Sequence, residues 1–81
     1  MTELEIKEQL KGFLCSDLGV DADALEFDTP LFGDGVGLDS IDSIEMISFI
    51  DETFGVSMTG VDKAHFQTID SLTAYIVANK E

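Results

Sequence analysis

A dense run of helix-breaking residues interrupts the chain well before its midpoint. These residues are Pro30, Gly33, Gly35 and Gly37. Neither a helix nor a strand tolerates that density of glycine and proline, so we expect a long connection from about Val20 to Asp39. Its apolar residues, expected to hold it onto a core, are Leu25, Phe27, Leu31 and Phe32. So long an ordered connection in a small chain favours a functional role for it.

Helical periodicity and capping signals surround this connection. Thr2 and Glu5 have the spacing of a capping box that opens a first helix, and Gly19 marks its end. The apolar residues at roughly helical spacing in this helix are Leu4, Ile6, Leu10, Phe13, Leu14 and Leu18. A second helix is predicted from about Ser40 to Phe54, with Gly55 as its stop.

The end of the chain predicts one more helix. Thr68 is a candidate cap for a helix from about Ile69 to Asn79, with Ile69, Leu72, Tyr75 and Ile76 on one face. Between Val56 and Phe66 we expect a loop with one short helical turn around Val61 to His65. The fold class is therefore all-α: a small four-helix bundle of three main helices plus one short helix, with a long first loop, forming a single domain over residues 1–81.

The charge balance limits the partners of such a domain. The chain has seventeen acidic residues, four lysines and no arginine, which gives a formal net charge of −13. Nucleic acids and anionic lipids would be repelled, whereas protein partners with basic patches would be attracted. No apolar run reaches the ~20 residues of a membrane span, and the acidic start of the chain does not have the basic-then-apolar pattern of a signal peptide. With Cys15 alone, a disulfide scaffold is excluded, and we expect a cytoplasmic monomer without membrane insertion.

The most distinctive chemistry lies at the start of the second predicted helix. Ser40 follows Asp39 directly after the glycine-containing loop, where another protein could reach it. No neighbouring residue would activate it as a nucleophile, so its hydroxyl suits attachment better than attack. Asp39 or Ser40 could instead serve only as the N-cap of the helix, which would explain the serine without any function.

The two sides of the second helix differ in character. At about 100° per residue, the core side would carry Ser43, Met46, Ile47, Ile50 and Phe54. The opposite side would carry Ile41, Ile44, Glu45, Ser48 and Glu52, with Asp42 and Phe49 near the boundary. Isoleucines ringed by acids are typical of a docking surface. The alternative is that the long loop folds back over Ile41 and Ile44.

The run from Pro30 to Met46 resembles the acyl carrier proteins. Their hallmark Asp-Ser-Leu at the start of the second helix stands here as Asp39-Ser40-Ile41. Further matches are Phe54-Gly55-Val56 at the helix end and Thr68-Ile69-Asp70-Ser71-Leu72 with Tyr75-Ile76 in the last helix. The resemblance covers nearly the whole chain in the expected order, and Phe49 departs from it by replacing a small residue.

This resemblance implies a carrier rather than an enzyme. Ser40 would bear 4'-phosphopantetheine, installed from coenzyme A by a phosphopantetheinyl transferase, with Asp39 and Ile41 completing the attachment motif. Acyl groups would be held as thioesters and presented to synthases, transferases or ligases with basic docking patches. The residues that match the family's partner surface are Asp39, Ile41, Asp42, Ile44, Glu45, Ser48 and Glu52. The candidate linings of an acyl pocket are Met46, Ile50, Val56, Met58, Phe66 and Tyr75, for which plain core packing is the alternative.

Other functions fit the residues less well. The pathway could be fatty-acid or polyketide synthesis, and a peptidyl or aminoacyl carrier has the same architecture. An acidic interaction module without a prosthetic group, or a small hydrolase using Ser40 and His65, are alternatives from other classes. The twelve residues from Asp34 to Glu45 have the length of an EF-hand loop, but Val36 and Leu38 stand where oxygen ligands are needed. No metal site is predicted.

Overall fold

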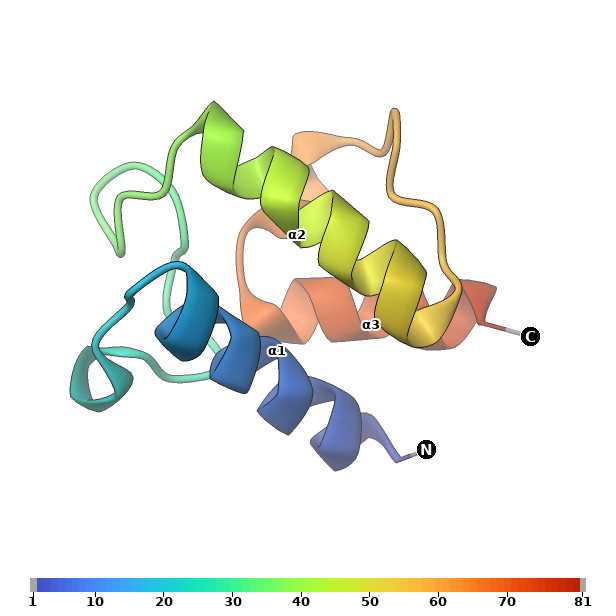
Figure 1. The fold of residues 1–81 in the computed structure, drawn as a ribbon, viewed down its shortest axis with the longest axis horizontal. Coiled ribbons are helices and arrows are strands. Elements are labelled where there is room, and N and C mark those ends of the chain that lie inside the picture. Colours follow the sequence, from blue (N-terminus) through green and yellow to red (C-terminus); the bar gives the residue numbers. More distant parts are fainter. Residues whose placement is uncertain (1, 81) are drawn as a thin grey trace.

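Three α-helices and two short 3-10 helices form the regular structure of residues 2–80, which are the residues that this computed structural model describes (Figure 1). The α-helices are α1 (Glu3–Asp17), α2 (Ser40–Phe54) and α3 (Ile69–Asn79). The 3-10 helices are η1 (Ala22–Ala24) and η2 (Lys63–Phe66). The all-α prediction is confirmed. The short turn expected around Val61 to His65 is η2, which lies slightly later in the chain.

Helix α1 begins at the predicted capping box. The Thr2 side chain accepts from the Glu5 N–H, and the Glu5 carboxylate accepts from the Thr2 N–H. This backbone hydrogen bond, with the side-chain hydrogen bond to Thr2, lowers the pKa of Glu5. The helix ends as predicted, because Gly19 adopts the left-handed backbone, φ 73°, that favours glycine.

The three helices enclose one hydrophobic core, and α1 packs against α3. The buried members of this core are Ile6, Leu10, Leu14, Leu25, Leu31, Met46, Ile50, Phe54, Val56, Met58, Phe66, Ile69, Leu72 and Ile76. Leu4 does not join them: its side chain is exposed, since at 100° per residue it lies about 120° from the centre of the buried stripe of α1. No helix among residues 2–80 has the length and apolar character needed to cross a membrane.

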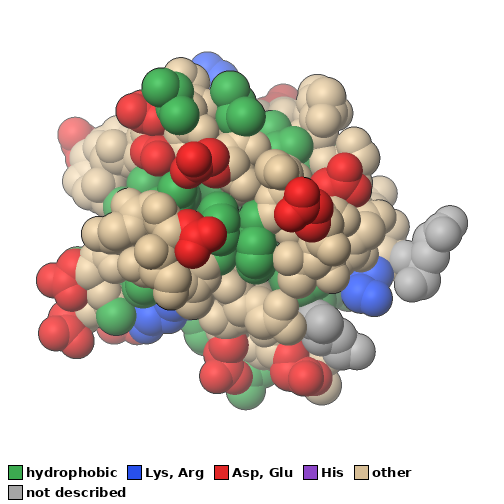
Figure 2. Space-filling model, viewed as in Figure 1, with side chains coloured by type: hydrophobic (Ala, Val, Ile, Leu, Met, Phe, Trp, Pro, Cys, Tyr) green, Lys and Arg blue, Asp and Glu red, His purple; other side chains and the backbone are tan. Residues whose placement is uncertain are grey.

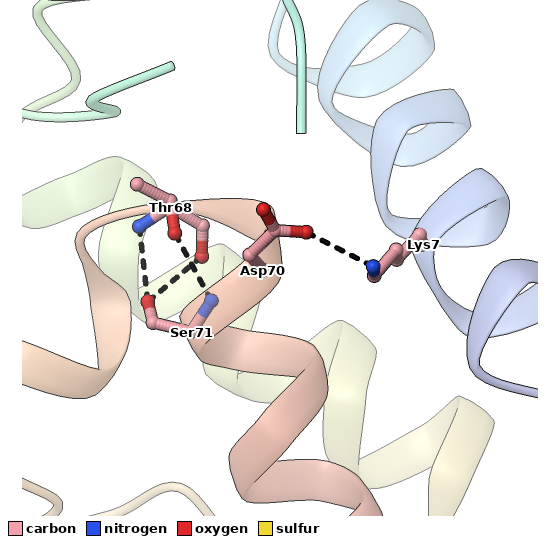
Figure 3. A network of polar contacts seen from close by, with 4 residues as sticks. All are labelled: Lys7, Thr68, Asp70 and Ser71. Carbon is pink, nitrogen blue, oxygen red and sulfur yellow. Dashed lines mark hydrogen bonds and ion pairs between the residues drawn. The ribbon is translucent and has the colours of Figure 1, made fainter. Parts of the chain in front are cut away.

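Helix α3 is tied to α1 at its first turn. Thr68 and Ser71 form the predicted cap through reciprocal backbone-to-side-chain hydrogen bonds, both 3.0 Å long (Figure 3). Beside this cap, Asp70 Oδ1 lies 3.1 Å from Lys7 Nζ of α1. The ion pair is partly exposed, so it contributes at most about 1 kcal/mol. The relative position of the two helices is set mainly by their packing in the core.

The long connection between α1 and α2 is folded onto the core, as predicted. Leu25 and Leu31 are fully buried. Within it, the Val36 N–H donates to the Pro30 carbonyl and the Leu38 N–H to the Leu31 carbonyl, each at 2.9 Å. The Leu31 N–H donates to the Gln67 carbonyl at 2.8 Å. The loop before α2 is therefore held to the segment before α3.

Gly35 is required where this loop passes Pro30. A Cβ atom at Gly35 would overlap the Pro30 carbonyl oxygen, whereas a Cβ atom at Gly12 in α1 would meet nothing within 4 Å. We expect Gly35→Ala to lower the free energy of unfolding by about 1–3 kcal/mol, the usual cost of overpacking. Gly12→Ala should raise it by about 0.5–1 kcal/mol through helix propensity. Urea denaturation at constant salt measures both, and equal effects of the two substitutions would contradict this account of the loop.

Candidate functional site

Asp39 is the N-cap of α2 and forms a reciprocal capping box with Asp42. Asp39 Oδ1 accepts from the N–H groups of Ile41 and Asp42, both at 3.0 Å. In return, Asp42 Oδ2 accepts from the Asp39 N–H at 3.0 Å. Of the two candidate caps, Asp39 takes the role, and Ser40 stands at the first helical position. Asp42 is half-buried because its carboxylate turns back into this box.

The Ser40 hydroxyl is left free by this arrangement. Ser40 is exposed, and its hydroxyl has no hydrogen-bond partner among residues 2–80. The capping explanation for Ser40 is therefore wrong, since the aspartate before it satisfies the first N–H groups of α2.

Ser43, one turn later, is in a different state. Its hydroxyl donates to the Ser40 carbonyl oxygen at 2.7 Å, and the residue is half-buried. This back-bond is a common one for serine inside a helix. The two serines near the start of α2 thus differ in both accessibility and hydrogen bonding, and Ser40 has the available hydroxyl.

Ser40 borders a pocket of about 500 Å³. The first loop contributes Pro30, Phe32 and Leu38, and α2 contributes Asp39, Ser40, Ser43 and Ile47. The segment before α3 contributes Met58, Gly60, Val61, Lys63, Phe66 and Gln67. The pocket is thus mostly apolar, and Lys63 is the one basic residue that lines it within the described part of the chain. It has the size and character of a small-molecule site.

The structure brings two of the six expected pocket residues to this site. Met58 and Phe66 line it, both from the segment between α2 and α3. Met46, Ile50 and Val56 are buried members of the core and do not line the pocket. Tyr75 lies elsewhere, with its ring 5.0 Å from that of His65. Plain core packing thus describes Met46, Ile50 and Val56 in this structure.

Besides Pro30, four apolar lining residues were not anticipated as such. They are Phe32, Leu38, Ile47 and Val61. Ile47 had a usable signal, because Ser40, Ser43 and Ile47 follow the i, i+3, i+7 spacing of one helix face. The other three come from loops, where no periodicity indicates which way a side chain points.

The outer face of α2 is open. Ile41 is 67 % exposed and Ile44 is 64 % exposed, so the alternative in which the loop covers them is wrong. Glu45, Ser48 and Glu52 are exposed as expected. Exposed isoleucines beside carboxylates form a surface on which a partner can make both apolar and ionic contacts.

The hydrolase alternative finds no support in the geometry. His65 is exposed and does not line the pocket that Ser40 borders. No hydrogen bond links His65 to Ser40 among residues 2–80, so the serine has no base in place.

Comparison with known proteins decides the family. The family model described as "Phosphopantetheine attachment site" matches residues 8–76. The chain belongs to the phosphopantetheine-binding acyl carrier family. The acyl carrier protein of Chlorobium phaeobacteroides is 32 % identical over 77 residues, covering 95 % of this chain and 97 % of its own. That of Onion yellows phytoplasma is 29 % identical over 72 residues, covering 89 % and 93 %.

Membership settles the class of activity. Acyl carrier proteins carry a covalently attached 4'-phosphopantetheine and are not enzymes. The residues present fit that group: the site offers a free hydroxyl at the first position of α2, and Lys63, a cation that can pair with a phosphate, lines the adjacent pocket. When bound, the group supplies a thiol that holds acyl groups as thioesters.

The cap of α2 gives the site its first test. Asp39→Ala should lower the free energy of unfolding by about 1 kcal/mol, because two N–H groups lose their acceptor. Asp39→Asn should stay close to the original chain, since asparagine caps a helix about as well as aspartate. Urea denaturation checks both. If the asparagine and alanine variants lost equal stability, the capping role would be refuted.

Proposed function

We propose that Ser40 is the attachment point of 4'-phosphopantetheine and that the chain carries acyl groups between biosynthetic enzymes. The observation that carries this proposal is the exposed Ser40 hydroxyl, without a hydrogen-bond partner among residues 2–80, at the mouth of an apolar pocket. Asp39 and Ile41 complete the motif: Asp39 caps the helix, and Ile41 is exposed beside the serine.

Attachment needs a separate transferase, because the site holds no base for Ser40. A phosphopantetheinyl transferase would remove the Ser40 proton while Ser40 Oγ attacks the β-phosphorus of coenzyme A. A serine–phosphate bond forms, the pyrophosphate bond breaks, and adenosine 3',5'-bisphosphate leaves. The cap fixes the backbone at the start of α2, so Ser40 is held at a defined place where the transferase can reach its hydroxyl.

The outer face of α2 would be the docking surface for such partners. Ile41 and Ile44 supply exposed apolar anchors, and Glu45 and Glu52 supply charge, with Ser48 between them. Asp42 would contribute less, because its carboxylate is engaged in the capping box. Basic patches on transferases, synthases and ligases would be steered onto this face, with an association rate that falls as salt rises.

The pocket beside Ser40 would shelter part of the acyl chain. Met58 and Phe66 are the lining residues common to the sequence prediction and the structure. Met46, Ile50 and Val56 belong to the same core as Met58, so a longer chain would reach them only by displacing packed side chains. Tyr75 would take part only after a similar rearrangement.

The relatives favour acyl over aminoacyl cargo, because their printed name is "Acyl carrier protein". Fatty-acid synthesis is the pathway we propose, with polyketide synthesis as a variant of the same chemistry. The acting form would be a cytoplasmic monomer, a single carrier domain over residues 1–81 that needs no nucleic acid, metal or membrane insertion.

The attachment site is tested by intact mass. After incubation with coenzyme A and a broad-specificity phosphopantetheinyl transferase, the chain should gain the mass of one phosphopantetheine. Ser40→Ala should gain nothing, whereas the matched control Ser43→Ala should gain it fully, because the Ser43 hydroxyl is not the acceptor. A mass gain that survives Ser40→Ala would contradict the assignment. No gain at all on the original chain would favour an interaction module without a prosthetic group.

The docking surface is tested by charge reversal. Glu45→Lys should slow the modification about tenfold at low salt, since it places a cation against the partner's basic patch. Glu8→Lys, which makes the same charge change on exposed α1, should have a much smaller effect. Stopped time courses at two salt concentrations measure both rates. Equal slowing by the two variants would assign the effect to net charge alone.

A further inference from the structure

A second hollow lies between the end of α1 and the outer side of α2. We call it the α1–α2 groove: it has a volume of about 420 Å³ and is lined by Phe13, Asp17, Glu45, Ser48, Phe49 and Glu52. Figure 2 looks onto this face and shows a hydrophobic floor between the two helices, with carboxylates around it. The groove is separate from the pocket at Ser40, with which it shares no lining residue.

The floor of the groove is a fixed aromatic surface. The rings of Phe13 and Phe49 are stacked, with centroids 4.2 Å apart and planes 12° apart. Phe49 also meets Phe54 edge to face, at 6.0 Å and 89°. Phe54 is buried, so it anchors the stack to the core, while Phe13 and Phe49 remain half-buried. Two aromatic side chains are thus held at the surface by a third.

The rim of the groove carries uncompensated negative charge. Asp17, Glu45 and Glu52 have no ion-pair partner among residues 2–80, and no lysine lines the groove. The occupant should therefore be a cation. A metal ion does not fit, because no three His, Cys, Asp or Glu side chains in the described part of the chain come together as ligands. The cation must instead be large enough to reach separate carboxylates while covering the aromatic floor.

The protein already holds one cation in this way. On the other side of α1, Lys7 Nζ lies 5.6 Å from the centroid of the Phe27 ring and 3.1 Å from Asp70 Oδ1. An aromatic face and a carboxylate together hold this ammonium group. The α1–α2 groove offers the same two kinds of contact, a ring surface and carboxylates, but no lysine among residues 2–80 lines it.

We propose that the α1–α2 groove receives an arginine side chain of a partner protein. A guanidinium group is planar, stacks on aromatic rings and bonds carboxylates with two parallel N–H groups, whereas a lysine ammonium does neither as well. The inference rests on the proposed carrier function for the identity of the partner. It adds α1 to the docking surface and makes Phe13, Asp17 and Phe49 determinants of which partners bind.

The chemistry of the groove can be tested without any partner. Arginine amide is titrated into the isotopically labelled full-length chain and followed by amide NMR, against lysine amide, leucine amide and sodium chloride at equal ionic strength. We expect saturable shifts at groove residues, with arginine amide bound about two- to fivefold more tightly than lysine amide. Equal shifts with sodium chloride or lysine amide, or stronger ones with leucine amide, would overturn the proposal.

Two variants with a matched control locate the effect. Asp17→Asn should weaken arginine-amide binding about two- to fivefold, while Glu8→Gln, which removes the same charge from another part of α1, should leave it unchanged. Phe49→Leu should abolish the preference for arginine over lysine, with spectral dispersion showing that the domain is folded. If Phe49→Leu does not fold, the comparison of Asp17→Asn with Glu8→Gln still tests the proposal. Equal affinities of these two variants for arginine amide would refute arginine binding in the groove.

This titration fails or succeeds independently of the carrier proposal. It uses the unmodified chain and does not involve the Ser40 hydroxyl. Arginine binding in the groove together with no mass gain at Ser40 would refute the carrier function alone. A normal mass gain with no selective arginine binding would refute the groove alone.

Discussion

The capping box between Asp39 and Asp42 is the interaction on which the site depends. A helix begins with N–H groups that have no partner within it, and something must accept from them. Here Asp39 accepts from Ile41 and Asp42, and Asp42 accepts from Asp39. Because this pair satisfies the start of α2, Ser40 can occupy the first helical position with its hydroxyl unused. A serine that capped the helix would be held by the backbone and less available for modification.

The first loop and the segment before α3 complete the site around this helix start. Hydrogen bonds within the loop, and from Leu31 to Gln67, hold the two segments together. Residues from both then line the pocket beside Ser40. Ordering so long a loop costs conformational entropy. The loop contributes a wall of the pocket, which a tight turn would be too short to form.

The sequence predicted the elements better than it predicted the pocket. Caps and stops such as Thr2, Gly55 and Thr68 act locally, so the bounds of the three α-helices followed from short-range chemistry. Periodicity also separated the exposed Ile41 and Ile44 from the buried Met46 and Ile50. The pocket residues Phe32, Leu38 and Val61 come from loops, whose directions depend on tertiary hydrogen bonds that no local pattern encodes. The packing of Phe13 against Phe49 was not predicted for the same reason, because it joins side chains of two different helices.

The central claim is that one hydroxyl of α2 is set apart for attachment. The most direct measurement is fragmentation mass spectrometry of the modified, unmutated chain, with backbone cleavage between residues 40 and 43 to separate the two serines. The account predicts that the phosphopantetheine is on Ser40 in every modified molecule. Finding it on Ser43, or on any other residue, would contradict the account.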